Sequence, residues 1–514
     1  DYGYAKSYLD NDEYFKVLND FYIKNNMLKD WNKMELPSDE EIENRLKAAR
    51  DKLVKQQIMM KEKKLPVIVL FEGWGAAGKG SVLGKVIKNI DPRFFKVAVM
   101  DEPTDEEKRK PFLYRHFIKI PEAGKFVFMD SGWMSEVTRQ KLRAELSDEQ
   151  YNKRVESIKR FERQLTDNGY LLLKFFFDID KKEQKKRLNK LKEDKNTKWR
   201  VSEHDKWQNK HYDECQIVYD QYLCDTNHSS APWYLVNAKD KKWAQLQVLE
   251  TIVQGIDTAF ANSALSVPLL QNAFPLKPIH KLSEVNLDKS LSDEEYERLL
   301  GMYQKKLGEL HNELYKKKIP VIIAYEGWDA AGKGGNIRRI AEALDPRGYE
   351  VHPIASPEPH EKARHYLWRF WNRLPKTGHI AIFDRTWYGR VMVERLEGFC
   401  SVNDWQRAYV EINEFEKELS DWGAVIIKFW VQIDKDTQLE RFKDRENTPE
   451  KRWKITEEDW RNREKWDSYE EAVNEMLLKT NTAYAPWHIL ESNDKKYARI
   501  KALKTVIEAL EARL

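Results

Sequence analysis

Residues 325–334 read Tyr-Glu-Gly-Trp-Asp-Ala-Ala-Gly-Lys-Gly, and they follow an apolar, strand-like run at 320–324. A G-x-x-x-x-G-K pattern after a strand is typical of a loop that binds phosphate oxygens with its backbone N–H groups and its lysine, at the N-terminus of a helix. The Ser or Thr that usually follows the lysine, and that usually binds Mg²⁺, is replaced by Gly334. We therefore expect a phosphate-binding loop whose metal is held by other groups.

The chain contains this loop twice. Residues 71–80 read Phe-Glu-Gly-Trp-Gly-Ala-Ala-Gly-Lys-Gly, again after an apolar run. The loop lysines Lys79 and Lys333 lie 254 positions apart (333 − 79), and the same offset separates Asp130 from Asp384. A repeat this long predicts two fused domains rather than a solenoid, whose units span about 20–50 residues.

The boundary between the copies is expected where prolines gather and helical periodicity is lost, at Pro268, Pro275 and Pro278. This predicts a first domain at 1–262 with an N-terminal extension before about residue 38, a linker at 263–290 and a second domain at 291–514.

Strand-like and helix-like segments alternate within each copy, which predicts an α/β fold with a parallel sheet covered by helices. A Ser-x-x-Glu helix start precedes each copy, at Ser38 and Ser292. In the second copy we expect strands at 319–325, 349–354, 379–384 and 425–431, and helices at 335–344, 365–374 and 436–445.

Two acids in the second copy suit a metal site. Asp329 lies inside the loop, and Asp384 ends an apolar strand. Mg²⁺ favours one or two carboxylates together with phosphate oxygens and water. Arg385 and Arg390 follow Asp384, and arginines near an acid suit a site that clamps a moving phosphoryl group.

Basic residues recur further along, at 441–445 and 451–454. Such runs usually mark a solvated helix face. They also suit a mobile basic lid that closes over a polyanion, and the phosphate-binding loop upstream favours the lid.

Composition limits the classes of partner. Lys and Arg number 89 and Asp and Glu 85, a net charge of +4, so a general nucleic-acid-binding surface is not expected. No apolar run approaches the roughly 18 residues of a spanning helix, and no signal peptide opens the given sequence. Three irregularly spaced cysteines indicate free thiols. We expect a cytoplasmic protein with no membrane or nucleic-acid partner.

The loop at 327–335 and the segment Asp-Arg-Thr-Trp-Tyr-Gly-Arg at 384–390 resemble the two signatures of the type-2 polyphosphate kinases. The resemblance covers nearly the whole chain as two tandem copies. It implies two P-loop kinase-like domains with a helical lid, dependence on Mg²⁺ (with Mn²⁺ as the alternative), and transfer of phosphate from inorganic polyphosphate to AMP to make ADP. Self-association is compatible with this family.

The resemblance also implies roles for residues of the second copy. Asp329 and Asp384 would bind the metal, and Lys333 and Arg385 would stabilise the transferring phosphoryl group. Further catalytic residues would be Arg390 and Arg445. The implied substrate-binding residues are Gly327, Trp328, Ala330, Ala331, Gly332, Gly334, Gly335, Tyr388, Glu394, Arg441, Lys454 and Asp459.

The first copy lacks most of this set, although Lys79 and Asp130 remain. Each lost polar group of this kind can be worth several kcal/mol in a phosphoryl transition state, so we expect the first copy to be inactive. It is either a structural half or a retained polyphosphate-docking surface; the structural half is favoured because sites without arginine bind polyanions poorly. The replacements are Gly75 for Asp329, Ser131 for Arg385, Glu136 for Arg390, Gln140 for Glu394 and Leu191 for Arg445.

Two other functions stay open from the sequence. One is an ATP-dependent nucleotide kinase on the same scaffold. The other is a polyphosphate-binding scaffold without catalysis, against which the intact set Asp329, Lys333, Asp384 and Arg385 argues.

Overall fold

The computed structural model describes residues 19–25, 28–31, 36–262 and 267–514. Most of the predicted N-terminal extension and the first residues of the predicted linker lie outside the described residues. The chain divides into two compact units, each treated separately below. Unit 1 comprises Asp1–Pro103, Arg115–Leu265 and Ala363–His365, and unit 2 comprises Thr104–Tyr114, Ser266–Lys362 and Tyr366–Leu514.

Each unit contains one five-stranded sheet in which all strands are parallel, which confirms the predicted fold class. The loop-bearing strand is central in both sheets, so the loop emerges at the middle of the sheet's carboxyl edge, where α/β proteins bind ligands. The order in unit 1 is β2 (Phe95–Val99), β3 (Phe126–Asp130), β1 (Val67–Gly73), β4 (Leu171–Asp178), β5 (Trp233–Asn237). The order in unit 2 is β7 (Tyr349–Pro353), β8 (Ile380–Asp384), β6 (Val321–Gly327), β9 (Val425–Gln432), β10 (Trp487–Glu491).

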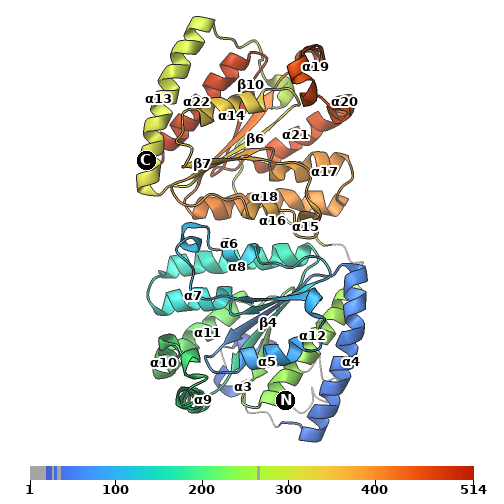
Figure 1. Ribbon diagram of the computed structural model, residues 1–514, viewed down its shortest axis with the longest axis vertical. Helices are drawn as coiled ribbons and strands as arrows, with labels where there is room; N and C mark the ends of the chain where they lie inside the picture. The colour runs from blue at the N-terminus through green and yellow to red at the C-terminus, as the bar shows by residue number, and fades with distance from the viewer. Residues whose placement is uncertain (1–18, 26–27, 32–35, 263–266) are drawn as a thin grey trace. The chain divides into compact units, whose positions relative to one another are not determined.

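Helices cover both faces of each sheet (Figure 1). The apolar side chains of the central strands are almost completely buried between these layers. In unit 2, one face carries α14 (Lys333–Ala341) and α22 (Lys495–Glu511), with α13 (Asp293–Lys317) packed on α22, and the other carries α18 (Val402–Asp421) and α21 (Trp466–Thr480). The corresponding helices of unit 1 are α5 (Lys79–Ile87), α12 (Lys241–Asn262), α4 (Asp39–Lys63), α8 (Asp148–Asp167) and α11 (Tyr212–Thr226).

A pair of helices follows the fourth strand of each repeat and occupies the place expected for the lid. In unit 2 these are α19 (Lys435–Asn447) and α20 (Glu457–Glu464), joined through η6 (Pro449–Lys454). In unit 1 they are α9 (Lys181–Glu193) and α10 (Glu203–Lys210), joined through η3 (Lys198–Arg200). The short remaining elements are α3 (Leu28–Trp31), α6 (Tyr114–Phe117), α7 (Trp133–Leu142), α15 (Pro359–Lys362), α16 (Trp368–Trp371), α17 (Val393–Leu396), η1 (Pro92–Phe94), η2 (Glu107–Arg109), η4 (Leu282–Glu284) and η5 (Trp387–Val391).

The predicted helix at 365–374 is wrong in extent, because only α16 (Trp368–Trp371) is helical there. Pro375 disfavours a helical conformation at Leu374, and the residues on either side of α16 form turns. The predicted helix starts are confirmed, since Ser292 Oγ accepts a hydrogen bond from the Glu295 N–H. Within the described parts of the chain, no helix is both long and apolar enough to cross a bilayer.

Candidate active site

The loop of unit 2 runs close to the neighbouring strand, and two glycines make this possible. A Cβ at Gly327 would lie 2.7 Å from the Val431 carbonyl oxygen, so no side chain fits there. Gly332, at φ 110°, caps α14 in the left-handed region that favours glycine. The first N–H groups of α14 therefore open into the loop, where they can bind an anion.

The loop lysine lies across the loop. Lys333 Nζ donates to the carbonyl oxygens of Gly327 at 2.8 Å and Trp328 at 3.1 Å. These contacts hold the ammonium group over the loop, where a phosphate oxygen could replace either carbonyl.

Two residues that were predicted to bind substrate instead support the loop. Trp328 is buried, stacks on Trp466 with ring centroids 3.7 Å apart, and donates from Nε1 to Gln432 at 2.9 Å. Arg441 is saturated by backbone acceptors, and burial lowers its pKa to about 10. Its guanidinium donates to the carbonyl oxygens of Ala330, Ala331, Ser492 and Asn493 at 2.6–3.0 Å.

Asp329 forms the centre of a polar cluster above the loop. Its carboxylate lies 3.5 Å from the Arg385 guanidinium and accepts a hydrogen bond from Asn462 Nδ2 at 3.1 Å. Gln438 donates to the Asp329 carbonyl oxygen at 3.0 Å. Burial opposes the charge of Arg385, but Asp329 and other nearby acids, Glu326 among them, together outweigh it, so the pKa of Arg385 is raised. The structure thus brings an acid of the loop and an arginine just after the end of β8 together.

Asn462 and Gln438 were missed by the sequence reasoning. Asn462 belongs to α20 and Gln438 to α19, so both lid helices are hydrogen-bonded to the loop. The repeat contained a signal, because unit 1 also has amides at these positions, Gln208 and Gln184.

Asp384 ends β8 at the carboxyl edge, in register with Tyr325 of β6. Within the described residues, no hydrogen bond or ion pair engages its carboxylate, which leaves it available to a cation. The next residue, Arg385, has φ 65°, and its N–H donates to the Tyr325 carbonyl oxygen. Ser131 of unit 1 has the same φ and the same bond to Phe71, so this left-handed turn belongs to the fold.

A buried carboxyl group lies beneath the site. Glu326 accepts hydrogen bonds at 2.7 Å from both the N–H and the hydroxyl of Thr386, and burial raises its pKa to about 7. Glu72 of unit 1 is bonded in the same way to Ser135, and burial likewise raises its pKa to about 7. This group was not predicted, and its presence in both units indicates a structural role.

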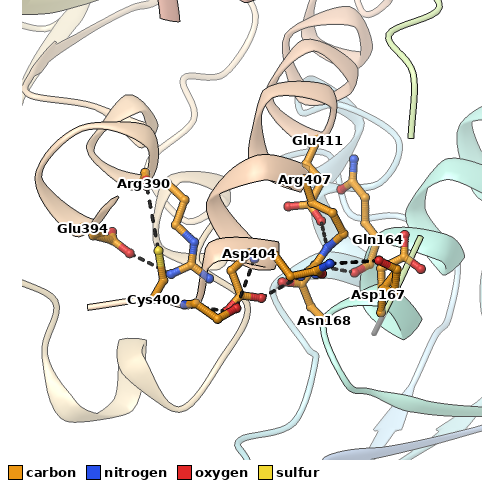
Figure 2. Close-up of polar contacts among 12 residues, drawn as sticks. Gln164, Asp167, Asn168, Arg390, Glu394, Cys400, Asp404, Arg407 and Glu411 are labelled. Carbon is orange, nitrogen blue, oxygen red and sulfur yellow. Dashed lines mark hydrogen bonds and ion pairs between the residues drawn. The ribbon is translucent and has the colours of Figure 1, made fainter. Parts of the chain in front are cut away.

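Arg390 and Glu394 form a pair of their own, shown in Figure 2. Arg390 Nη1 donates to Glu394 at 2.7 Å, and the guanidinium lies over the Tyr366 ring at 4.6 Å. Glu394 raises the pKa of Arg390 although burial opposes it. No contact of this pair with Asp329 or Lys333 is present among the described residues.

Tyr388, a predicted substrate-binding residue, is completely buried and faces the core. Its hydroxyl donates to Glu416 at 2.5 Å and accepts from Lys428 Nζ at 2.7 Å. Lys428 also pairs with Glu416 at 2.9 Å. This placement corrects the assignment, because Tyr388 satisfies a buried ion pair and cannot reach a substrate at the loop.

The remaining predicted residues lie on the lid. Arg445 donates to the Lys454 carbonyl oxygen at 3.0 Å, and Lys454 is exposed. Asp459 accepts from the Thr456 N–H at 2.7 Å at the start of α20. Its observed function is therefore helix capping. The loop residues Ala330, Ala331, Gly334 and Gly335 lie along the loop and the first turn of α14, and their binding of substrate stays a prediction.

The loop of unit 1 has the same lysine contacts, but different side chains lie above it. Lys79 donates to Gly73 and Trp74 as its counterpart does, and Gln208 accepts from the Gly75 N–H at 2.8 Å. A Cβ at Gly75 would lie 2.1 Å from an oxygen of Asp205. The carboxylate of Asp205, from α10, thus occupies the space where unit 2 has the Asp329 side chain.

A parallel α/β sheet, a phosphate-binding loop, and an acid beside an arginine define a protein of the phosphoryl-transfer class. The family model described as polyphosphate kinase 2 (PPK2) matches residues 36–263 and 290–514. The chain belongs to the polyphosphate kinase 2 family, which confirms the resemblance seen in the sequence.

Individual relatives match both repeats together. A polyphosphate:AMP phosphotransferase of Pseudomonas aeruginosa is 40% identical over 470 residues, which cover 90% of this chain and 94% of that protein. One of Pseudomonas syringae pv. tomato is 41% identical over 92% of this chain and 96% of that protein. A crystal structure described as a polyphosphate kinase 2 from P. aeruginosa PA01 has a TM-score of 0.80 at 37% identity, covering 94% of this chain and 98% of that one.

Proposed function

We propose that this protein transfers a phosphoryl group from inorganic polyphosphate to AMP and so makes ADP, at a site in unit 2. The relatives with this activity in their names span nearly the whole chain at about 40% identity, which supports the reaction. The observation that carries the location is the pairing of Asp329 with Arg385 above the loop. Unit 1 has Gly75 and Ser131 at these positions.

In the proposed reaction, an oxygen of the AMP phosphate attacks the terminal phosphorus of polyphosphate. The new P–O bond forms as the bond to the bridging oxygen breaks, and the shortened chain leaves with that oxygen. Lys333 and the N–H groups at the start of α14 bind phosphate oxygens, while Arg385 neutralises charge that develops on the transferring group.

The residues present fit a divalent cation, for which we propose Mg²⁺, with Mn²⁺ as the alternative. Asp329 and Asp384 supply two carboxylates, and Gly334 supplies no hydroxyl ligand. Within the described residues, no group of three or more His, Cys, Asp or Glu could hold a metal, so phosphates and water would complete the shell. A bound cation would neutralise the phosphate oxygens.

The hydrogen bond from the lid to Asp329 has to break before the carboxylate is free to bind a cation. Asn462 Nδ2 now donates to that carboxylate, and Gln438 holds the adjoining backbone. Withdrawal of α20 would break the Asn462 bond and expose the acid. We propose that this exchange couples lid motion to binding.

The test supplies AMP and polyphosphate as sole substrates, without ATP, and measures ADP. ADP should form with wild type and fall about a hundredfold or more with Asp329→Asn or Arg385→Ala, because each removes a charged group from the site. Ser131→Ala, at the counterpart of Arg385, should leave the rate unchanged. No ADP from wild type would reject the reaction and favour an ATP-dependent nucleotide kinase or a non-catalytic scaffold.

The setting proposed is the cytoplasm, because AMP is an intracellular nucleotide and the structure's three cysteines are free, as expected in a reducing compartment.

A further inference from the structure

The lid helices of unit 1 form a shallow, strongly cationic recess open to solvent, here named the lysine groove. It lies between α9 and α10, which pack against each other (Figure 1), and has a volume of about 530 Å³. Five lysines and one asparagine line it, and all five lysines are exposed. The lining residues are Lys181, Lys182, Lys185, Lys206, Asn209 and Lys210.

Few of these charges are compensated within the protein. Lys181 lies 3.9 Å from Asp213, and Lys206 pairs with Glu203. Among the residues that the structure describes, no acid comes within ion-pair distance of Lys182, Lys185 or Lys210. Like charges held on two packed helices repel one another, so an anion that enters the groove would relieve an existing cost.

The groove is also held in shape by a polar bridge. Asn209 Nδ2 donates to the Lys181 carbonyl oxygen at 3.0 Å and to Gln184 at 2.9 Å. This bridge ties α10 to the first turn of α9, so the lysine side chains project from a fixed pair of helices.

Unit 2 shows that the fold does not require these lysines. Of the five groove lysines, only Lys181 has a basic counterpart at the offset of 254, Lys435. Several lysines of unit 1 are acids in unit 2, so the sign of the charge changes at these positions. The lysines with acidic counterparts, unit 1 first, are Lys182/Asp436, Lys186/Glu440, Lys190/Asp444, Lys192/Glu446 and Lys210/Glu464. Two further groove lysines have apolar counterparts, Lys185/Leu439 and Lys206/Trp460.

We propose that the lysine groove of unit 1 binds inorganic polyphosphate, separately from the loop site of unit 2, and keeps the donor chain on the enzyme. The proposal rests on the proposed function, which makes polyphosphate the substrate. Polyphosphate is a flexible chain of regularly spaced negative charges. Lysines suit it because they act as mobile point charges and need no fixed geometry.

The composition of the groove argues against a nucleic acid as the occupant. Binding of single strands commonly uses aromatic side chains on which bases stack. The lining contains no aromatic residue. Charge without a stacking surface fits a polyanion that has no bases.

With polyphosphate bound in the lysine groove, unit 1 is more than a structural half. Its loop lacks the arginines of unit 2. The cationic residues lie instead on the lid helices. A chain held there remains at high local concentration for unit 2, because both units belong to one polypeptide. Long polyphosphate should gain most, because a long chain can contact several groove lysines and still present a free end.

The test compares two triple variants with the same change in charge. The groove variant is Lys182→Glu/Lys185→Glu/Lys210→Glu. The control is Lys47→Glu/Lys55→Glu/Lys96→Glu, which changes exposed lysines of unit 1 outside the groove. Binding of fluorescently labelled long polyphosphate is measured by anisotropy in an Asp329→Asn background, and steady-state kinetics are measured without that substitution. Thermal denaturation verifies that each variant is folded.

The groove variant should bind long polyphosphate roughly tenfold more weakly at low salt, and the salt dependence of its binding should fall by about one charge per lysine removed. Its KM for long chains should rise to a similar extent, while kcat, the KM for AMP and the KM for short chains stay constant. Unchanged long-chain binding, or an equal loss in the control, would overturn the proposal.

Two further results separate the alternatives. If single-stranded RNA of equal charge displaces labelled polyphosphate from the groove as efficiently as unlabelled polyphosphate does, the site is a nucleic-acid site and the proposal is overturned. If wild type makes no ADP while the groove still binds polyphosphate, the proposed reaction fails and the binding site stands.

Discussion

A single position, Asp329 in unit 2 and Gly75 in unit 1, separates the two loops most sharply. Asp329 contacts an arginine and a lid amide, whereas the corresponding space in unit 1 is filled by the Asp205 carboxylate. The sequence showed the missing acid. It could not show the replacement, because Asp205 comes from a helix about 130 residues away in the chain (205 − 75).

We predict that Gly75→Asp does not make unit 1 active. The new Cβ would lie 2.1 Å from a side-chain oxygen of Asp205, so that side chain has to shift, and the repulsion of two carboxylates adds to the cost. In an Asp329→Asn background the substitution should restore no ADP formation and should lower Tm. Adding Asp205→Ala should recover most of the lost Tm; a Gly75→Asp protein as stable as its parent would contradict the clash.

The raised pKa of Glu72 leads to a prediction about pH. Glu72 belongs to unit 1, whereas the proposed metal-binding residues belong to unit 2. Burial raises the pKa of Glu72 to about 7 from its ordinary value of 4.5, so between these pH values the folded state holds a proton that the unfolded state releases. Its contribution to stability is present below pH 4.5 and is lost as the pH rises through 7, at about 1.4 kcal/mol per pKa unit. Glu72→Gln has no such loss.

The Tm of Glu72→Gln relative to wild type should therefore increase between pH 5 and pH 8, as measured by thermal denaturation. A difference in Tm that is the same at both pH values would show that Glu72 does not titrate in this range.

At the scale of elements, the strands could be predicted to within two residues, and the roles of several side chains could not. Alternation of apolar strands with charged helices locates the carboxyl edge of the sheet, and with it Asp329, Asp384 and Arg385. The role of Arg441 depends on how α19 packs beneath the loop, which the sequence does not contain. From the sequence alone, a basic residue on a helix near the loop is easily assigned to substrate binding. The structure shows that the acceptors of Arg441 are backbone carbonyl oxygens.

The role of Tyr388 likewise could not be predicted from the sequence, and its structural role can be tested. Tyr388→Phe removes a hydroxyl that bonds both Glu416 and Lys428 in the core. The loss of partners for a buried pair should cost about 1–3 kcal/mol of unfolding free energy, measured by urea denaturation. The KM values for AMP and polyphosphate should not change. A raised KM with unchanged stability would return Tyr388 to the substrate-binding residues.

At the scale of the whole molecule, duplication has produced two units with the same sheet and the same loop lysine but different polar surroundings. Unit 2 keeps the acid and arginine above its loop. Unit 1 has a lid rich in lysine and a loop whose space is filled from α10. This division suggests that one unit performs the chemistry while the other retains the donor.

The two loop lysines provide the most direct test, because Lys79 and Lys333 make the same pair of hydrogen bonds to their own loops. Lys333→Ala and Lys79→Ala are compared by the rate of ADP formation from AMP and polyphosphate, with thermal denaturation to verify folding. If unit 2 alone is active, Lys333→Ala should lower kcat at least a hundredfold, while Lys79→Ala should keep the wild-type rate. Similar losses in both variants, or a loss in Lys79→Ala alone, would contradict an active site confined to unit 2.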